Sequence, residues 1–320
     1  MTRLKRPDRQ QGHAAALPIW VGVLIAICVI AFTRTAVRAQ VPVIYFSTET
    51  SFTATAGPHA GQRISDGDLL STTGVVVARN ADLIRNFGPM PVVPDFGLDG
   101  VFVRRSGEIL FSLEGGFWDE KLGTWVRHGD LLSDSGAIVK TNAQLLANFH
   151  PMPSPEPYDF GLDAVHPIGG QRVEFSIEET FWDEALGVWV RHGDLLSDSG
   201  AIVKTNAQLL SNFHPMPSPD PDYGLDAVHL VGGSDIWFSI EESFWDELLG
   251  TWISQGDLLS TQGSIVQTNA QLLAAFFGGA GNVPEDFGLD AAWLVPEPAT
   301  FVLLTFGGLV WLRRRRKPTA

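Results

Sequence analysis

The sequence repeats a unit of about 63 residues four times, and this repetition constrains the fold more than any other feature of the chain. Each unit contains three phrases in the same order: F-S-x-E-x-x-F, then G-D-L-L-S and, after a gap, D-[FY]-G-L-D-[AG]. Corresponding residues are 62 to 65 positions apart, which indicates copies of one structural module. The copies occupy about 42–105, 106–168, 169–231 and 232–295.

The third copy indicates how one unit folds. Hydrophobic and polar residues alternate from Arg172 to Glu178, which is typical of a half-buried strand. A second strand over 162–168 precedes it across a Gly-Gly pair, which favours a hairpin. Residues 189–197 and 201–204 are predicted to form two more strands, and a short helix is predicted from Thr205 to Phe213. Each unit therefore contains four antiparallel strands and one helix.

The first and last copies are out of phase with the other two. The array begins with an F-S phrase that no G-L-D phrase precedes, and it ends with a G-L-D phrase that no F-S phrase follows. Residues 42–49 and 288–294 would therefore complete one sheet by pairing with each other. We predict an all-β fold with short helices, arranged as a four-repeat β-propeller-like ring whose split blade is closed by the N- and C-terminal strands. An open β-rich repeat array is the alternative.

The charge of the repeat domain limits its partners. Of the 22 basic residues, 11 lie in residues 1–39 or 313–317, which leaves 11 basic and 34 acidic residues for the repeat domain, 40–295. The net charge of that domain is then near −23, and it repels phosphate backbones. Nucleic acid is therefore excluded as a partner, whereas cations and neutral sugars remain.

The N-terminus has the pattern of a secretory signal. Four basic residues precede an apolar run over 17–32, and small residues follow before Gln40. We predict a signal peptide over 1–39 that is cleaved after Ala39. The alternative is an uncleaved membrane anchor, because the apolar run is nearly long enough to span a bilayer.

The C-terminus combines three elements in a fixed order. A rigid polar break, Pro296-Glu297-Pro298, precedes an apolar segment over 299–312, which is predicted to cross the membrane. A basic block then follows and is expected to stay in the cytoplasm. The residues of this block are Arg313, Arg314, Arg315, Arg316 and Lys317.

This end of the chain, over residues 296–317, closely resembles the PEP-CTERM sorting signal of Gram-negative bacteria. The resemblance implies that an exosortase, a membrane protease, recognises the signal and releases or transfers the protein to the surface. It further implies a protein of the bacterial cell envelope, first anchored in the membrane and then located at the surface or outside the cell. Proteins of this kind are frequent in organisms that form biofilms and secrete exopolysaccharide.

The repeats loosely resemble hemopexin-type propellers. The resemblance depends on the strand order, the trailing helix, the Asp-Ala opening of each unit and an aromatic pair after the second strand, as at Phe181-Trp182. It implies a propeller fold. The unit is longer here, and the F-S-x-E phrase differs from the hemopexin phrase.

Acidic residues that recur in every copy are the first candidate site. If the G-L-D aspartates begin the innermost strands, four carboxylates could surround a central channel and hold a hard cation such as calcium. The competing interpretation is that the repeated aspartates, including those of G-D-L-L-S, cap turns. No other cofactor is expected. The four aspartates are Asp99, Asp163, Asp226 and Asp290.

Recurrent tryptophans are the second candidate site. Trp118, Trp182 and Trp245 belong to the phrase F-W-D-E-x-L-G-x-W, and exposed tryptophans could stack on sugars. Packing between repeats is the competing interpretation. The carboxylates around this phrase could support glycoside hydrolysis, but they recur in several copies, as a solvated acidic rim would. Six histidines recur in pairs in the second and third copies and are expected to be structural.

These observations favour a non-catalytic protein of the cell surface or extracellular matrix, with a structural or adhesive propeller. The alternative is a carbohydrate-binding propeller of the exopolysaccharide matrix. A glycan-cleaving enzyme is the third hypothesis.

Overall fold

A computed structural model describes residues 42–93, 95–152, 159–169, 172–217 and 222–296 of the chain. The predicted signal peptide, the predicted membrane segment and the basic tail lie outside these residues. The chain divides into two compact units, residues 1–42 and 43–320, and the fold described here belongs to the second.

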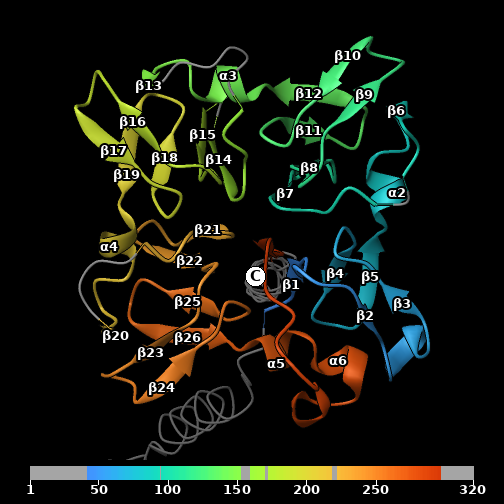
Figure 1. The fold of residues 1–320 in the computed structure, drawn as a ribbon. Helices are drawn as coiled ribbons and strands as arrows, with labels where there is room; N and C mark the ends of the chain where they lie inside the picture. Colours follow the sequence, from blue (N-terminus) through green and yellow to red (C-terminus); the bar gives the residue numbers. More distant parts are fainter. Residues whose placement is uncertain (1–41, 94, 153–158, 170–171, 218–221, 297–320) are drawn as a thin grey trace, which may run out of the picture. The chain divides into compact units, whose positions relative to one another are not determined.

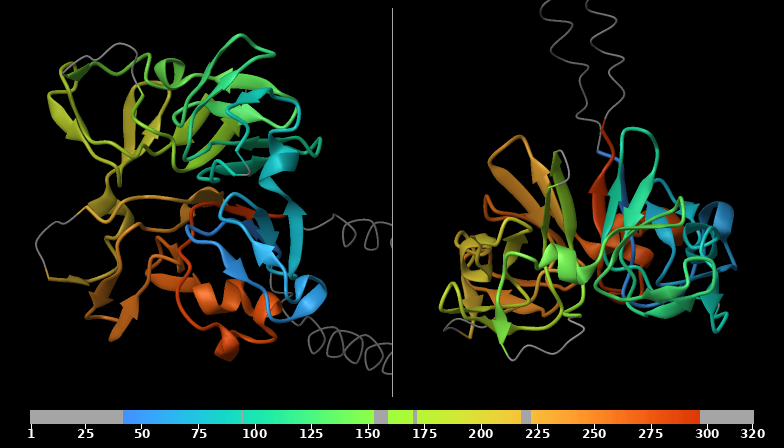
Figure 2. Two further views of the ribbon diagram at one scale, coloured as in Figure 1. Left: turned by 45° about the vertical axis from the view of Figure 1, so that its right-hand side comes forward. Right: turned by 90° about the horizontal axis from the view of Figure 1, so that it is seen from above.

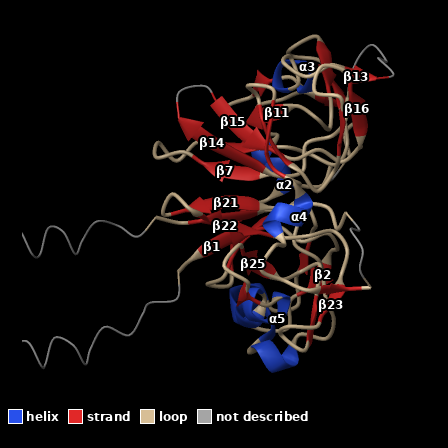
Figure 3. Cartoon of the chain, turned by 90° about the vertical axis from the view of Figure 1, so that its left-hand side faces the viewer, coloured by secondary structure: helices blue, strands red, loops and turns tan. Residues whose placement is uncertain are grey.

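Each of the four repeats contributes to a four-stranded antiparallel sheet (Figures 1 and 3). The second sheet has the order β7 (Val101–Val103), β8 (Ile109–Phe111), β11 (Leu131–Ser133) and β12 (Ala137–Lys140). The third has β14 (Val165–Gly169), β15 (Arg172–Phe175), β18 (Leu195–Ser197) and β19 (Ala201–Lys204). The fourth has β21 (Val228–Val231), β22 (Asp235–Phe238), β25 (Leu258–Ser260) and β26 (Ser264–Gln267).

The first sheet combines strands from opposite ends of the repeat array. Its order is β27 (Ala292–Leu294), β1 (Ile44–Phe46), β4 (Leu69–Ser71) and β5 (Val75–Ala78). β1 and β27 are antiparallel, with Ile44 opposite Leu294 and Phe46 opposite Ala292, and the turned views show them side by side (Figure 2). The predicted pairing of 42–49 with 288–294 is thus confirmed.

Smaller sheets lie outside the four main ones. A hairpin of one repeat pairs with a two-residue strand of the preceding repeat, as where β9 (Phe117–Asp119) pairs with β10 (Thr124–Val126) and β6 (Pro89–Met90). The equivalents are β13 (Pro151–Met152), β16 (Phe181–Asp183) and β17 (Val188–Val190), then β20 (Pro215–Met216), β23 (Phe244–Asp246) and β24 (Thr251–Ile253). The first repeat has only β2 (Phe52–Thr53) and β3 (Arg63–Ile64).

The prediction of one strand over 189–197 is therefore wrong. β17 belongs to the outer sheet and β18 to the main sheet, because the chain turns between them. The turn is closed by the Asp194 amide, which donates to the Arg191 carbonyl, and by the Arg191 amide, which donates to the Asp194 carboxylate. The turn gives each repeat two sheets instead of one.

The predicted helices are present but shorter than expected. They are α2 (Asn80–Leu83), α3 (Asn142–Leu145), α4 (Asn206–Leu209) and α5 (Asn269–Leu272), with α6 (Ala274–Phe277) and the 3-10 turns η1 (Gly57–His59) and η2 (Ala280–Asn282) in addition. Thr205 begins α4 as predicted, because its hydroxyl accepts from the Gln208 amide and the Gln208 side chain accepts from the Thr205 amide. The helix ends before Phe213.

The hydrophobic core is divided into four clusters, each shared by neighbouring repeats. One cluster joins Phe149 of the second repeat to Phe175 of the third, and another joins Leu272 of the fourth repeat to Phe46 of the first. The innermost strands follow the same cycle, because β7 contacts β14, β14 contacts β21, β21 contacts β27, and β27 contacts β7. Each repeat therefore buries its apolar side chains only with a neighbour on both sides.

Candidate functional site

The G-L-D aspartates converge next to the innermost strands. All four are buried, with 6 to 9% of their surface exposed. The small residue that follows each aspartate lets these strands approach closely: at Gly100 a Cβ atom would crowd the Asp163 carbonyl oxygen. One carboxylate oxygen of each aspartate, Oδ2, has no hydrogen-bond partner. These residues are Asp99, Asp163, Asp226 and Asp290.

The glutamates of the F-S-x-E phrase lie beside this group. The Glu178 carboxylate lies over Gly161, whose φ is +73°, and a side chain at that glycine would overlap it. The other repeats have the same arrangement, in which the G-L-D glycine has a φ between +71° and +72°. The glycine is therefore required both for its left-handed backbone and for the space that the glutamate occupies. The glutamates are Glu49, Glu114, Glu178 and Glu241.

We expect Gly161→Ala to lower the free energy of unfolding by more than the backbone cost of about 1–2 kcal/mol, because the Glu178 side chain must also move from its place. The matched control is Gly187→Ala, because Gly187 has a similar φ of +67° and no atom within 4 Å of the added Cβ. That control should lose only the backbone cost, about 1–2 kcal/mol. Urea unfolding of both variants measures the difference, and equal losses would contradict the role of Glu178.

Burial and mutual repulsion raise the pKa of each central aspartate well above its usual value. For Asp99 the largest cause is desolvation, followed by the charge of Asp290. For Asp163 the charge of Asp99 is second to desolvation. Burial also raises the pKa of Glu49 and of Glu114 to about 7, with neighbouring carboxylates adding to the shift. The eight carboxyl groups therefore form one electrostatically coupled cluster.

These glutamates are contacted by a residue of the preceding repeat, and the type of that residue differs from one repeat to another. The imidazole Nδ1 of His128 lies 3.1 Å from the Glu178 carboxylate, and its Nε2 lies 3.1 Å from Asp159. Hydrogen bonds to Asp159 and Glu178 raise the pKa of His128 to about 10. Hydrogen bonding to Glu241 likewise raises the pKa of His192. In the fourth repeat the corresponding residue is Gln255, which donates to Glu49.

Four aromatic side chains pack together on the innermost strands, C-terminal to the central aspartates. They lie three residues after the aspartates, and three residues of extended strand separate Cα atoms by about 10 Å. The ring centroids of Phe102 and Trp293 are 4.2 Å apart, and those of His166 and His229 are 5.2 Å apart. We call this group the aromatic floor; its members are Phe102, His166, His229 and Trp293.

The convergence of His166 and His229 was missed from the sequence. Burial lowers the pKa of His166 to about 4 and that of His229 to about 3. Both imidazoles are therefore neutral near pH 7. The Nδ1 atom of each is buried and has no hydrogen-bond partner.

Two other sets of repeated aspartates are structural. In G-D-L-L-S, Asp194 accepts from the Arg191 amide and from the Asn206 amide at the start of α4. Asp68, Asp130 and Asp257 each accept from the equivalent pair of amides. In F-W-D-E, Asp183 is fully buried and accepts from the Leu186 and His150 amides. The acidic rim predicted around F-W-D-E is therefore limited to exposed residues such as Glu179 and Glu184.

The tryptophans of the phrase F-W-D-E-x-L-G-x-W are all partly or largely exposed. In each of the three-stranded outer sheets, two tryptophans and a methionine lie opposite one another on adjacent strands and hence on one face. The most exposed, Trp125, Trp189 and Trp252, are 55%, 56% and 63% exposed. We call these sets the Met-Trp-Trp rows: Met90, Trp118, Trp125; Met152, Trp182, Trp189; and Met216, Trp245, Trp252.

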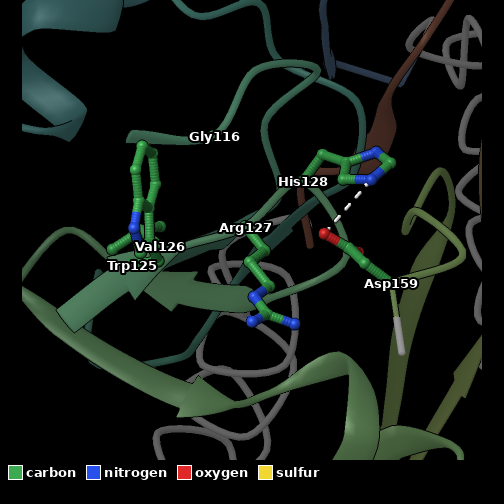
Figure 4. A pocket seen from close by; sticks show the side chains of 6 residues that line it. All are labelled: Gly116, Trp125, Val126, Arg127, His128 and Asp159. Atoms are coloured by element: carbon green, nitrogen blue, oxygen red, sulfur yellow. Dashed lines mark ion pairs between the residues drawn. The ribbon is translucent and has the colours of Figure 1, made fainter. Parts of the chain in front are cut away.

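One row borders a pocket of about 420 Å³ (Figure 4). In the second repeat Gly116 takes the place of Thr180 and Ser243, which leaves room beside the strand that bears Trp125. The pocket therefore combines an aromatic face with a guanidinium group and a carboxylate. Its lining residues are Gly116, Trp125, Val126, Arg127, His128 and Asp159.

The C-terminal sequence identifies the type of sorting signal that the chain carries. β27 ends at Leu294, and Pro296 follows after one residue. The chain carries a PEP-CTERM protein-sorting motif over residues 294–317. The PEP-CTERM motif marks a protein that is exported, processed by an exosortase and sorted to the cell surface. Within the part of the chain that the structure describes, no helix is both long and apolar enough to cross a membrane.

Similarity to other known proteins is distant. No curated protein matches the sequence. A catalytically inactive variant of virginiamycin B lyase from Staphylococcus aureus, solved with quinupristin, matches 52% of this chain over 44% of its own length. The sequence identity is 11% and the TM-score is 0.21, so nothing about this chain is inferred from the lyase.

Proposed function

We propose that this exported protein is a non-catalytic, closed four-bladed propeller that binds neutral polysaccharide at the cell surface through its Met-Trp-Trp rows. The ring is supported by the shared β1–β27 sheet and by the core cluster that joins the last repeat to the first. The non-catalytic assignment is supported by Asp119, Asp183 and Asp246, which are fully buried and accept backbone hydrogen bonds within turns.

The observation that carries the proposal is the exposure of the rows. Large exposed apolar groups that recur in the same place are typical of interaction surfaces. Here each row pairs two tryptophans edge to face, with ring centroids 5.7 to 6.2 Å apart, so the outer ring has a fixed orientation. An indole face held in this way can stack on the C–H face of a pyranose ring.

The polar groups beside Trp125 fit the same ligand. Arg127 and Asp159 line the same pocket as Trp125 and offer a donor and an acceptor for sugar hydroxyls, with Asp159 on the side of His128 (Figure 4). The net negative charge of the repeat domain disfavours acidic polysaccharides. Three rows on one chain would allow several weak sites to bind one polymer at the same time.

We expect Trp125→Ala to weaken binding of a neutral polysaccharide by about tenfold, and Trp125→Ala with Trp189→Ala and Trp252→Ala to abolish it. Affinity electrophoresis or a glycan array with the detergent-solubilised full chain measures this. Val75→Ala is the matched control, because Val75 is 46% exposed and belongs to the first repeat, which has no row. Undiminished binding by the triple variant would refute the proposal.

A further inference from the structure

We propose that the central carboxylates bind one hard divalent cation of the size of calcium, with Asp99, Asp163 and Glu178 as its protein ligands. One oxygen from each of these three side chains lies within 4.8 Å of the other two. Oxygen ligands about 2.4 Å from a common calcium ion are at most about 4.8 Å apart, so the three can share one ion. This site lies apart from the tryptophans of the Met-Trp-Trp rows, although its ligand Glu178 contacts His128, which also lines the pocket beside Trp125. The proposal does not require the function proposed above.

The unpartnered oxygens point to a ligand. The Oδ2 atoms of Asp99 and Asp163 are buried and accept no hydrogen bond, although the two residues are only 7% exposed. A buried carboxylate oxygen without a partner is costly, because it has lost its hydration. Asp99 and Asp163 both belong to the group of three that can share an ion, and a cation bound by both carboxylates would compensate for the missing partners.

The charge around the group supports the same conclusion. Eight carboxyl groups are coupled here, four from aspartates and four from glutamates. Asp66, Asp95, Asp159, Asp222 and Asp286 add further acidic groups around them. Among the described residues, the basic side chains paired with these acids are the imidazoles of His128 and His192. A divalent cation would compensate part of the excess.

The geometry also leaves the proposed site accessible to an ion from solvent. The side chain of Glu178 is 34% exposed, so the glutamate side of the group faces solvent. The register of β14 and β15 places Glu178 on the opposite side of Asp163 from His166. The aromatic floor therefore closes the far side, and water would complete the coordination from the glutamate side.

Calcium alone is the probe in the test. We expect isothermal titration of the detergent-solubilised full chain, after chelation, to detect one calcium ion per chain with a dissociation constant below about 1 mM. The melting temperature should rise by about 5 °C when calcium exceeds its dissociation constant about 100-fold.

Asp163→Asn distinguishes a lost ligand from a lost fold. The amide keeps the shape of the side chain and removes a repelling charge, so this variant should melt at the same temperature as the wild type or higher without calcium. It should lose the calcium-dependent rise. Glu184→Gln, at an exposed acidic residue of the third repeat, is the control and should keep it.

Two outcomes would overturn the proposal. One is a wild-type protein that neither binds calcium nor changes its melting temperature at about 5 mM calcium. The other is an Asp163→Asn variant that keeps the full calcium response, since binding would then be a surface effect of the acidic domain.

Discussion

Tyr45→Pro is expected to lower the free energy of unfolding by about 3 kcal/mol or more and to open the first sheet. Tyr45 lies in β1, between β27 on one side and β4 on the other, and it is opposite Trp293. Proline removes a backbone donor from the middle of a sheet. In this sheet the loss also separates the two ends of the repeat array.

Tyr45→Phe is the matched control, because it keeps the backbone amide and the aromatic ring. Hydrogen exchange measured by mass spectrometry should detect faster exchange in β27 of the proline variant, about 250 residues away in the sequence. Unchanged protection of residues 292–294 in a proline variant of wild-type stability would contradict closure of the array by these strands.

Replacing both histidines of the aromatic floor by phenylalanine is expected to stabilise the protein increasingly as the pH falls. Burial lowers the pKa of His166 to about 4 and that of His229 to about 3, whereas an unfolded histidine has its usual value near 6.5. The unfolded state therefore binds more protons below pH 6.5. The contribution of each wild-type histidine is complete above pH 6.5 and is lost as the pH falls through its folded pKa.

The free energy of unfolding is measured for the wild type and for the double variant at a series of pH values, and the difference between the two proteins is compared across pH. Between pH 6.5 and about 4, each histidine costs the wild type about 1.4 kcal/mol per pH unit relative to the His166→Phe/His229→Phe double variant. The raised pKa values of the central aspartates act in the opposite direction, but they are common to both proteins and cancel. Phe102 occupies the equivalent position on β7 of the second sheet, so the floor accommodates phenylalanine. A difference in unfolding free energy that is independent of pH would show that these histidines titrate normally.

Much of this fold could be predicted from the sequence because it depends on repetition. The spacing of the phrases identified the module, and the phase offset identified β1 and β27 as partners. The convergence of Asp99 and Asp163 followed from the same repetition, because equivalent residues of modules around an axis face one another. The cation itself stays a proposal.

The features that were missed depend on contacts between different modules. The outer sheets pair a two-residue strand such as Pro151–Met152 with the next repeat, and so short a segment has no periodicity to detect. From the sequence, Glu178 was grouped with the carboxylates of an acidic rim. Its place in the central group depends on the register of β14 and β15, which the sequence pattern does not give. The aromatic floor was hidden because its four positions hold three different residue types, Phe, His and Trp.

The split first sheet has a consequence for when the protein can fold. Ile44 is among the first residues of the repeat domain to be exported, and its partner Leu294 is among the last. Joining strands this far apart requires closing a very long loop, so this step comes late and slowly. The first repeat must therefore wait, with its apolar face incomplete, until the segment directly before the sorting motif has been exported. Completion of the fold thus requires the strand that directly precedes the sorting motif.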